Sequence, residues 1–160
     1  MSCATALAIR PVSAPLAPFG LIADLGALDQ VIAALDHGHV MDRALDAAIY
    51  EALGWHVIRT PISRRRITWR ARSPLSTAWL PLPSPTGDQA DAASVVPHGW
   101  DHGSGVRGGQ PFGWVRERRT RPGREGPEFF EATRLNAARA LTTAALFGHR
   151  FIATTGGRPC

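Results

Sequence analysis

The sequence predicts an α+β protein with a small antiparallel β-sheet packed with helices in an α-β-α sandwich. Two observations lead to this fold class. Apolar residues recur with helical spacing near both ends of the chain, whereas apolar and polar residues alternate in its middle. Together these patterns predict helices that pack on a small sheet and bury their apolar faces against it.

The length of 160 residues suits one domain with a single core. We expect residues 21–150 to form this domain, residues 1–20 to be a disordered or loosely packed Pro/Ala-rich leader, and residues 151–160 to be a flexible tail. No apolar run reaches the roughly 18 residues that a membrane-spanning helix needs, and residues 1–20 make a poor secretory signal. A protein of the bacterial cytoplasm without a membrane partner is therefore expected.

Two helices are expected first. Apolar residues lie on one face of the earlier helix, at Leu28, Val31, Ile32 and Leu35. The later helix carries an apolar residue every four positions, at Met41, Leu45, Ile49 and Leu53. Gly54 suits the left-handed position that ends this helix.

Residues 55–72 change to a period of two and predict a β-hairpin that begins at Trp55. One face is apolar and the other is cationic and wet. The apolar face holds Ile67, Trp69 and Ala71, and the wet face holds Arg66, Thr68, Arg70 and Arg72. The proline-rich residues 73–86 then permit an extended edge segment but not a central strand.

The second half of the chain predicts a short helix, a loop, two strands and a closing helix. Thr86-Gly-Asp-Gln89 is a capping-box pattern that starts a helix over 87–96, and the Gly-rich residues 97–111 indicate a mobile loop. Residues 112–118 and 128–131 are strand candidates. Thr133 is the expected N-cap of the last helix and Gly148 its terminator. The buried side of that helix is expected to hold Ala138, Leu141, Ala145 and Leu146.

Charge is distributed unevenly along the chain. All 18 basic residues are arginine. Residues 21–54 hold six carboxylates and one arginine, a net charge of −5, whereas residues 55–124 hold twelve arginines and four carboxylates, a net charge of +8. Opposed blocks can face each other within the fold or between subunits, which leaves room for a homo-oligomer. The formal charge of +5 therefore does not by itself imply a nucleic-acid partner.

Three runs of sequence resemble the small phage and prophage proteins called phage ABA sandwich domain proteins. The first is L-D-x-x-I-x-x-A-L-G-W at 45–55, the second combines P-T at 85–86 with D-A-A at 91–93 and V-P-x-G-W at 96–100, and the third is the Ala-rich helix at 132–146. The similarity extends from about Leu28 to Gly148, although the third run departs from the family's usual pattern. The resemblance implies an α/β fold and a viral context, and it brings no active-site residues.

Several patterns that suggest chemistry lack the required context. Gly103-Ser-Gly-Val-Arg-Gly108 spells the dinucleotide fingerprint, but no strand is expected before it and no helix after it. His98 and His102 have metal-ligand spacing only on a helix, which Pro97 argues against. Ser104 lacks the strand-to-helix turn of a serine nucleophile. We therefore expect no metal, no cofactor and no enzymatic activity.

The interleaving of arginine with tryptophan remains as the candidate binding feature. Guanidinium groups and aromatic rings together can hold a nucleotide, with the ring stacked on the base and arginine on the phosphate. The alternative is that the tryptophans fill the core between sheet and helices, as the strand phase indicates for Trp55 and Trp69, while the arginines lie on the wet face. The candidate ligand-binding residues are Arg64, Arg65, Arg66, Arg70, Trp79, Trp100, Arg107, Arg116 and Arg118.

Three functional hypotheses remain. The favoured hypothesis is a protein-interaction module that binds a host or phage protein and modulates host defence or phage gene control. The alternatives are a binder of an anionic nucleotide, such as a signalling nucleotide, and a nonspecific nucleic-acid binder whose affinity falls steeply with salt.

Overall fold

The computed structural model describes residues 24–37, 42–64, 66–120, 123 and 125–155, and these residues form four helices and two three-stranded antiparallel sheets. The α+β class is confirmed. The first sheet has the strand order β1-β2-β3 and the second sheet β4-β5-β6. The elements are α1 (Leu25–Ala34), α2 (Arg43–Ala52), β1 (His56–Ser63), β2 (Arg66–Arg72), β3 (Leu80–Pro81), α3 (Gln89–Ser94), β4 (Trp100–Arg107), β5 (Gln110–Glu117), β6 (Phe129–Thr133) and α4 (Ala137–Thr155).

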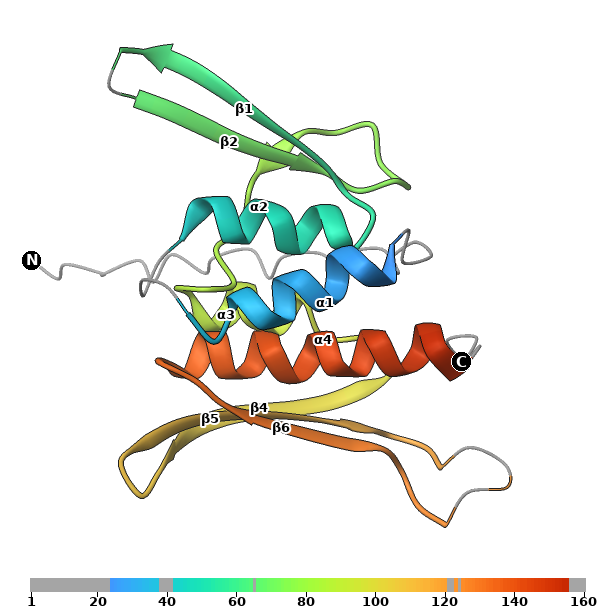
Figure 1. Cartoon of the computed structure of the whole chain (residues 1–160). Coiled ribbons are helices and arrows are strands. Elements are labelled where there is room, and N and C mark those ends of the chain that lie inside the picture. Colours follow the sequence, from blue (N-terminus) through green and yellow to red (C-terminus); the bar gives the residue numbers. More distant parts are fainter. Residues whose placement is uncertain (1–23, 38–41, 65, 121–122, 124, 156–160) are drawn as a thin grey trace, which may run out of the picture.

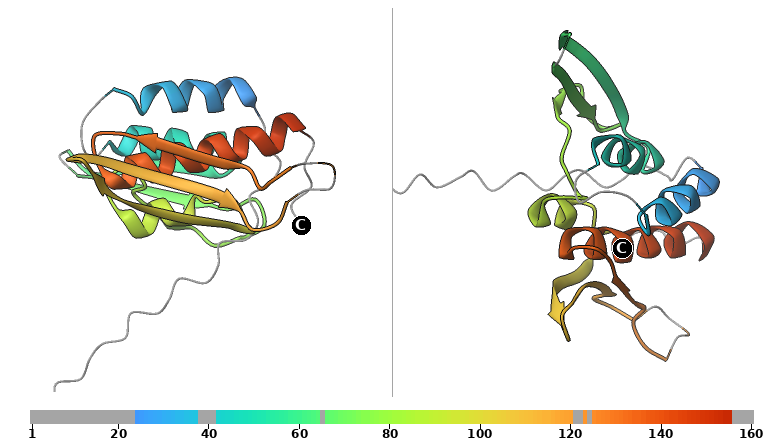
Figure 2. Two further views of the ribbon diagram at one scale, coloured as in Figure 1. Left: turned by 90° about the horizontal axis from the view of Figure 1, so that it is seen from below. Right: turned by 60° about the vertical axis from the view of Figure 1, so that its left-hand side comes forward.

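The order of layers differs from the expected one, in which helices cover a single sheet. The helices lie between the two sheets, so that each sheet turns one face outward (Figures 1 and 2). Helix α2 packs on β1 and β2, helix α4 packs on all three strands of the second sheet, and α1 contacts both α2 and α4. The prolines that follow β3 lack the N–H groups that a continued strand would donate, which helps to keep the sheets separate.

The elements before residue 82 agree closely with the sequence. Asp24 and Asp42 cap α1 and α2 by accepting hydrogen bonds from backbone N–H groups of the first turns. Gly54 has a φ of 81° and ends α2 in the left-handed conformation. The hairpin β1-β2 then forms, and residues 80–81 add the short edge strand β3.

Two expectations for residues 86–111 are wrong. Helix α3 begins at Gln89 with Asp88 as its N-cap, whereas Thr86 is buried and bonds elsewhere. The expected Gly-rich loop is largely the strand β4 and its turn into β5. Gly108 and Gly109, both with positive φ, make the tight turn of a β-hairpin. The Gly-Gly pair is a hairpin signal in the sequence, but the many other glycines of this segment favoured the interpretation as a loop.

The last helix starts later and ends later than expected. Asn136, not Thr133, accepts a hydrogen bond from the backbone N–H of Arg139, at 2.8 Å. Gly148 lies inside α4, where Pro97 and Trp100 pack against it too closely for a larger side chain to fit without a shift. Helix α4 continues through Thr155, so residues 151–155 are not part of a tail, while residues 1–20 and 156–160 lie outside the described part.

One buried carboxylate joins the segments that separate the two sheets. Asp46 on α2 is 0% exposed and accepts hydrogen bonds from the backbone N–H and hydroxyl of Thr86, from the Ser84 hydroxyl and from the Arg43 guanidinium. Arg43 also donates to the carbonyls of Leu82 and Pro83. We call Arg43, Asp46, Ser84 and Thr86 the polar cluster. It fixes the connection between β3 and α3 onto α2.

We predict that Asp46→Ala destabilises the fold by roughly 3 kcal/mol, because it leaves the buried donors of the polar cluster without an acceptor. Asp29→Ala is the matched control, since Asp29 forms an exposed ion pair with Arg150 whose loss should change stability by less than about 1 kcal/mol. Urea unfolding of both variants tests this. Equal losses of unfolding free energy in the two variants would contradict the prediction, because the buried carboxylate would then stabilise the fold no more than an exposed one.

Candidate functional site

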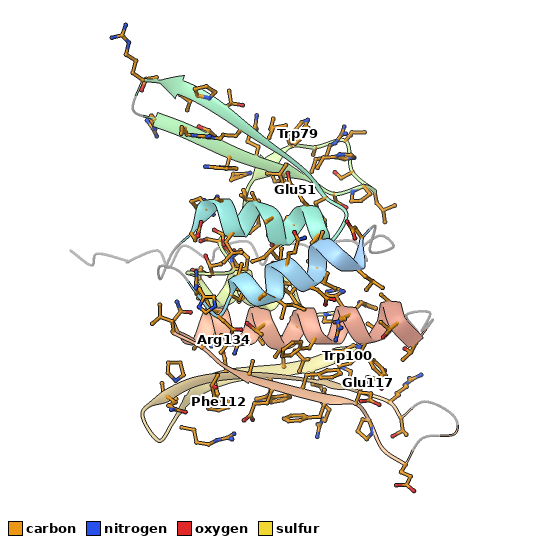
Figure 3. The ribbon with its side chains drawn as sticks, viewed as in Figure 1. Glu51, Trp79, Trp100, Phe112, Glu117 and Arg134 are labelled. Carbon is orange, nitrogen blue, oxygen red and sulfur yellow. The ribbon has the colours of Figure 1, made fainter. Side chains whose placement is uncertain are left out.

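The structure separates the predicted binding residues into two groups. Arg64, Arg66, Arg70 and Trp79 belong to the first sheet or its connections, whereas Trp100, Arg107, Arg116 and Arg118 belong to the second sheet or its end. The layer of helices lies between the groups, and Figure 3 shows Trp79 and Trp100 on opposite sides of it. Arg65 lies outside the described residues. The nine residues therefore do not line one common site.

Trp100 is part of the core rather than of a binding surface. It is buried, its ring stacks on Phe130 with centroids 6.0 Å apart, and it makes an edge contact with Phe151 on α4. Trp55 is also buried, in edge contact with Tyr50. A core position was expected for Trp55, and the structure assigns Trp100 the same role.

The first sheet carries cations without carboxylates. Residues 56–81 contain six arginines and no aspartate or glutamate. Within the described part of the chain, no ion pair involves the five of these arginines that are described, at positions 59, 64, 66, 70 and 72. This surface is therefore electrostatically uncompensated and suits an anionic partner.

Aromatic groups, instead of carboxylates, position several of these cations. The guanidinium carbon of Arg72 lies 5.0 Å from the ring centroid of Trp79, and that of Arg59 lies 5.6 Å from the ring centroid of Trp69. Arg70 donates a hydrogen bond to the backbone carbonyl of Trp79, at 3.2 Å. Such contacts hold the side chains in place and leave the positive charge free to act on a partner.

Aliphatic side chains are exposed among the same arginines, a feature that the sequence analysis missed. Near its base the hairpin is covered by α2, where Ala71 is fully buried. Toward its tip the hairpin rises away from α2 (Figure 1), and Ile62 and Ile67 are 60% and 42% exposed. Ile58 and Leu80 are exposed as well. We define the arginine-isoleucine surface as the exposed side chains on both faces of the hairpin and on β3. Arg59, Ile67 and Leu80 share the face of Ala71, and Ile58, Arg66 and Arg70 lie on the other face. The remaining members, Ile62 and Arg64, lie near the tip.

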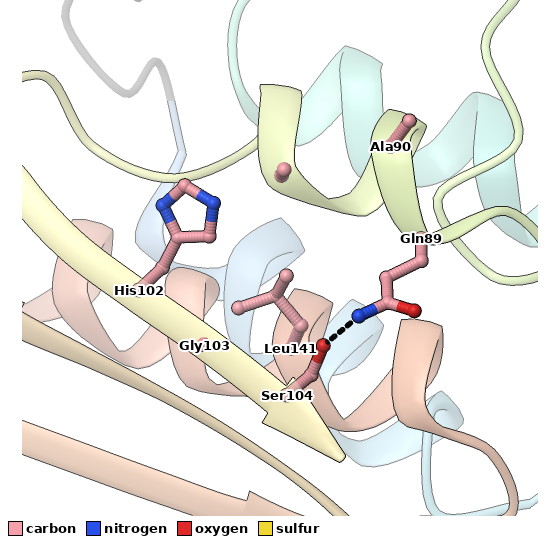
Figure 4. A pocket seen from close by; sticks show the side chains of 7 residues that line it. Gln89, Ala90, His102, Gly103, Ser104 and Leu141 are labelled. Carbon is pink, nitrogen blue, oxygen red and sulfur yellow. Dashed lines mark hydrogen bonds between the residues drawn. The ribbon is translucent and has the colours of Figure 1, made fainter.

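A cleft of ≈ 480 Å³ lies between α3 and β4, lined by polar residues, by small residues and by Leu141 of α4 (Figure 4). The Gln89 amide donates a hydrogen bond to the Ser104 hydroxyl there. Within the described residues no hydrogen bond joins Ser104 to His102, so this cleft does not contain a connected nucleophile and base. Nor do any three His, Cys, Asp or Glu side chains of the described segments gather as metal ligands would.

Two buried titratable groups have shifted pKa values. Burial raises the pKa of Tyr50, whose hydroxyl hydrogen-bonds to the Ser94 hydroxyl. Burial lowers the pKa of His149 on α4 from 6.5 to about 4, although a hydrogen bond between its Nε2 and the Val95 carbonyl opposes this shift. Both groups belong to the helical core and lie away from the arginine-isoleucine surface. They bear on stability rather than on binding.

Comparison with known proteins yields no relative. No protein-family model matches the chain, and neither a curated protein nor a solved structure matches it. The resemblance to phage ABA sandwich domain proteins stays a prediction. In the described residues, no helix combines the length and apolar character needed to cross a membrane.

We predict that His149 makes the fold less stable as the pH falls from 6.5 to about 4. In this window the unfolded histidine binds a proton that the folded one excludes, so its contribution is complete above pH 6.5 and declines toward pH 4, by roughly 3 kcal/mol in total. The measurement is urea unfolding across this range for the wild type and His149→Gln. The glutamine does not titrate, so the variant should show a shallower pH dependence, and parallel curves would contradict the prediction.

Proposed function

We propose that the protein is a non-enzymatic protein-interaction module whose arginine-isoleucine surface binds an acidic, partly apolar partner protein. The observation that supports this most directly is a projecting hairpin with uncompensated arginines and exposed isoleucines. Arginine and aromatic residues are enriched at protein interfaces, and an exposed apolar patch marks a contact site. Carboxylates of the partner would supply the countercharge that residues 56–81 lack.

The exposed aliphatic residues favour a protein over a nucleic acid as the partner of this surface. Nucleic-acid backbones are contacted by charged and polar side chains, and Ile62, Ile67 and Leu80 offer neither hydrogen bonds nor stacking faces. Burying these side chains against an apolar patch would instead contribute binding energy from the hydrophobic effect. Self-association through two copies of this surface is disfavoured, because it would oppose two sets of unpaired arginines.

The biological setting of such a partner follows only from the sequence resemblance. A phage protein that binds a host or viral protein would modulate host defence or phage gene control. Nonspecific nucleic-acid binding is the alternative for this surface, and it differs in a measurable way. Its affinity would fall with salt along a steep linear log–log slope set by released counterions.

We predict that a photo-crosslinking amino acid at position 62, near the hairpin tip, captures a protein in cells, and that Arg66→Glu with Arg70→Glu abolishes the adduct. The double charge reversal replaces attraction to carboxylates by repulsion, so loss of at least tenfold is expected, about 1.4 kcal/mol or more. Gel shift and mass spectrometry of the adduct provide the readout.

The matched control is Arg116→Glu with Arg118→Glu, which changes the net charge equally but leaves the first sheet intact. This control should retain the adduct. Adducts that contain nucleic acid, or adducts that survive the reversal at 66 and 70, would contradict a protein partner on this surface. Circular dichroism of both double variants confirms that each is folded.

A further inference from the structure

The outer face of the second sheet has a different chemistry from the first. Alternate residues of β5 point to opposite sides, and Val115 is fully buried on the side of α4. The side chains between these buried positions therefore face away from the helices. This outer face holds three aromatic rings, which we call the aromatic platform: Phe112, Trp114 and Phe129.

Glycines on the neighbouring strand allow these rings to lie against the sheet. Gly103 on β4 pairs with Trp114, and Gly105 pairs with Phe112. A Cβ atom added to Gly103 would lie 2.7 to 2.8 Å from three atoms of the indole, and one added to Gly105 would lie 3.3 Å from the phenyl ring. The rings thus occupy the space that side chains of β4 would fill, and both are partly exposed.

The platform spans adjacent strands, with one guanidinium group over a ring and two at its margin. Trp114 and Phe129 stack with centroids 6.1 Å apart and an angle of 27° between their planes, and Phe129 is 51% exposed. The guanidinium carbon of Arg107 lies 4.4 Å from the ring centroid of Phe112. Arg116 and Arg118 lie at the margin.

These arginines, unlike those of the first sheet, are paired. Arg107 pairs with Glu131 at 3.1 Å, and Asp101 pairs with Arg118 at 2.8 Å and Arg116 at 3.8 Å. All the arginine partners are more than half exposed, so the pairs are weak and exchangeable. Three cations and two carboxylates leave this face close to neutral.

We propose that the aromatic platform binds single-stranded nucleic acid by stacking its unpaired bases, with the marginal arginines contacting phosphate. Aromatic faces accept any base, and guanidinium groups that flank them hold the backbone. Among the described residues of β4, β5 and β6, no aliphatic side chain lies on the outer face, whereas the arginine-isoleucine surface carries several. The two surfaces therefore suit different partners. A duplex hides its base faces and would not stack in this way.

The open shape of the platform favours a strand over a free nucleotide. A single base would be covered on one side only, whereas successive bases of one strand can occupy successive rings and combine their contacts. Because the face is close to neutral, stacking rather than counterion release should dominate the affinity. The log–log salt dependence is then shallow, no steeper than a slope of about −2.

The test is fluorescence anisotropy of a labelled, mixed-sequence single-stranded DNA of roughly a dozen nucleotides, a length within the site sizes of known single-strand-binding domains. Wild-type protein should bind it more tightly than the same sequence as duplex. Trp114→Ala should weaken binding by roughly tenfold through the loss of one stacking ring, and Trp114→Phe should restore most of it. A second variant, Gly103→Ala, keeps the indole but pushes it off the sheet, and should also weaken binding.

The control is the double variant Arg66→Glu with Arg70→Glu, which should bind the strand as the wild type does. No binding, equal binding of duplex, or unchanged affinity in Trp114→Ala would overturn the proposal. So would loss of binding in the Arg66/Arg70 variant alone, since the nucleic acid would then occupy the first sheet. Because the measurement uses no protein partner, its failure leaves the proposed function untouched, and the reverse also holds.

Discussion

The hydrogen bonds of the Asp46 carboxylate hold together the parts of the molecule on which both surfaces depend. Asp46 lies on the helix that supports the first sheet, and its partners Ser84 and Thr86 lie in the connection toward the second. The same connection is tied to α4, because Asn136 donates to the Thr86 carbonyl and Thr142 donates to the Pro85 carbonyl. A buried charge is tolerated here because its oxygens are fully engaged.

Arg139 shows the opposite situation within the same helical layer. It is 1% exposed, and its Nη1 donates to the His37 carbonyl at 3.1 Å, but its Nε and Nη2 atoms have no partner among the described residues. The single hydrogen bond ties the start of α4 to the end of α1, where a cation interacts favourably with the helix dipole. The helical layer thus combines one well-satisfied buried charge with one that is poorly satisfied, and the first contributes far more to the unique arrangement of the chain.

The early elements could be predicted because their signals are local. Aspartate caps, an apolar residue every four positions and a left-handed glycine determine α1 and α2 without reference to the rest of the chain. The later errors share a physical cause, which is that a contact with a residue far away in the sequence decided the role of each misassigned residue. Thr86 was assigned as a cap because of its spacing, yet Asp88 performs that role and the Thr86 hydroxyl satisfies a buried carboxylate forty residues away. Gly148 was assigned as a terminator, yet its lack of a side chain serves the packing of Trp100.

The binding surfaces were only partly predictable for a related reason. The sequence identified the arginines and tryptophans, but it could not show that the helices divide them between two faces. The glycines at 103 and 105 predict a loop from the sequence. The structure shows instead that they pair with Trp114 and Phe112, and that their missing side chains leave room for these two rings. The alternating pattern places Ile67 on the apolar face of the hairpin, but it shows only the side of the strand on which a residue lies. It does not show how far α2 covers that face, and Ile67 is exposed.

The separation of the two sheets has a consequence for how the surfaces work. No strand is shared between the sheets, and each rests on a different helix, α2 for the first and α4 for the second. A ligand on one sheet can influence the other only through the helical layer, where the polar cluster and the contacts of α1 with both helices provide the connection. The two surfaces share no residue, so the two proposed partners would not compete for the same side chains.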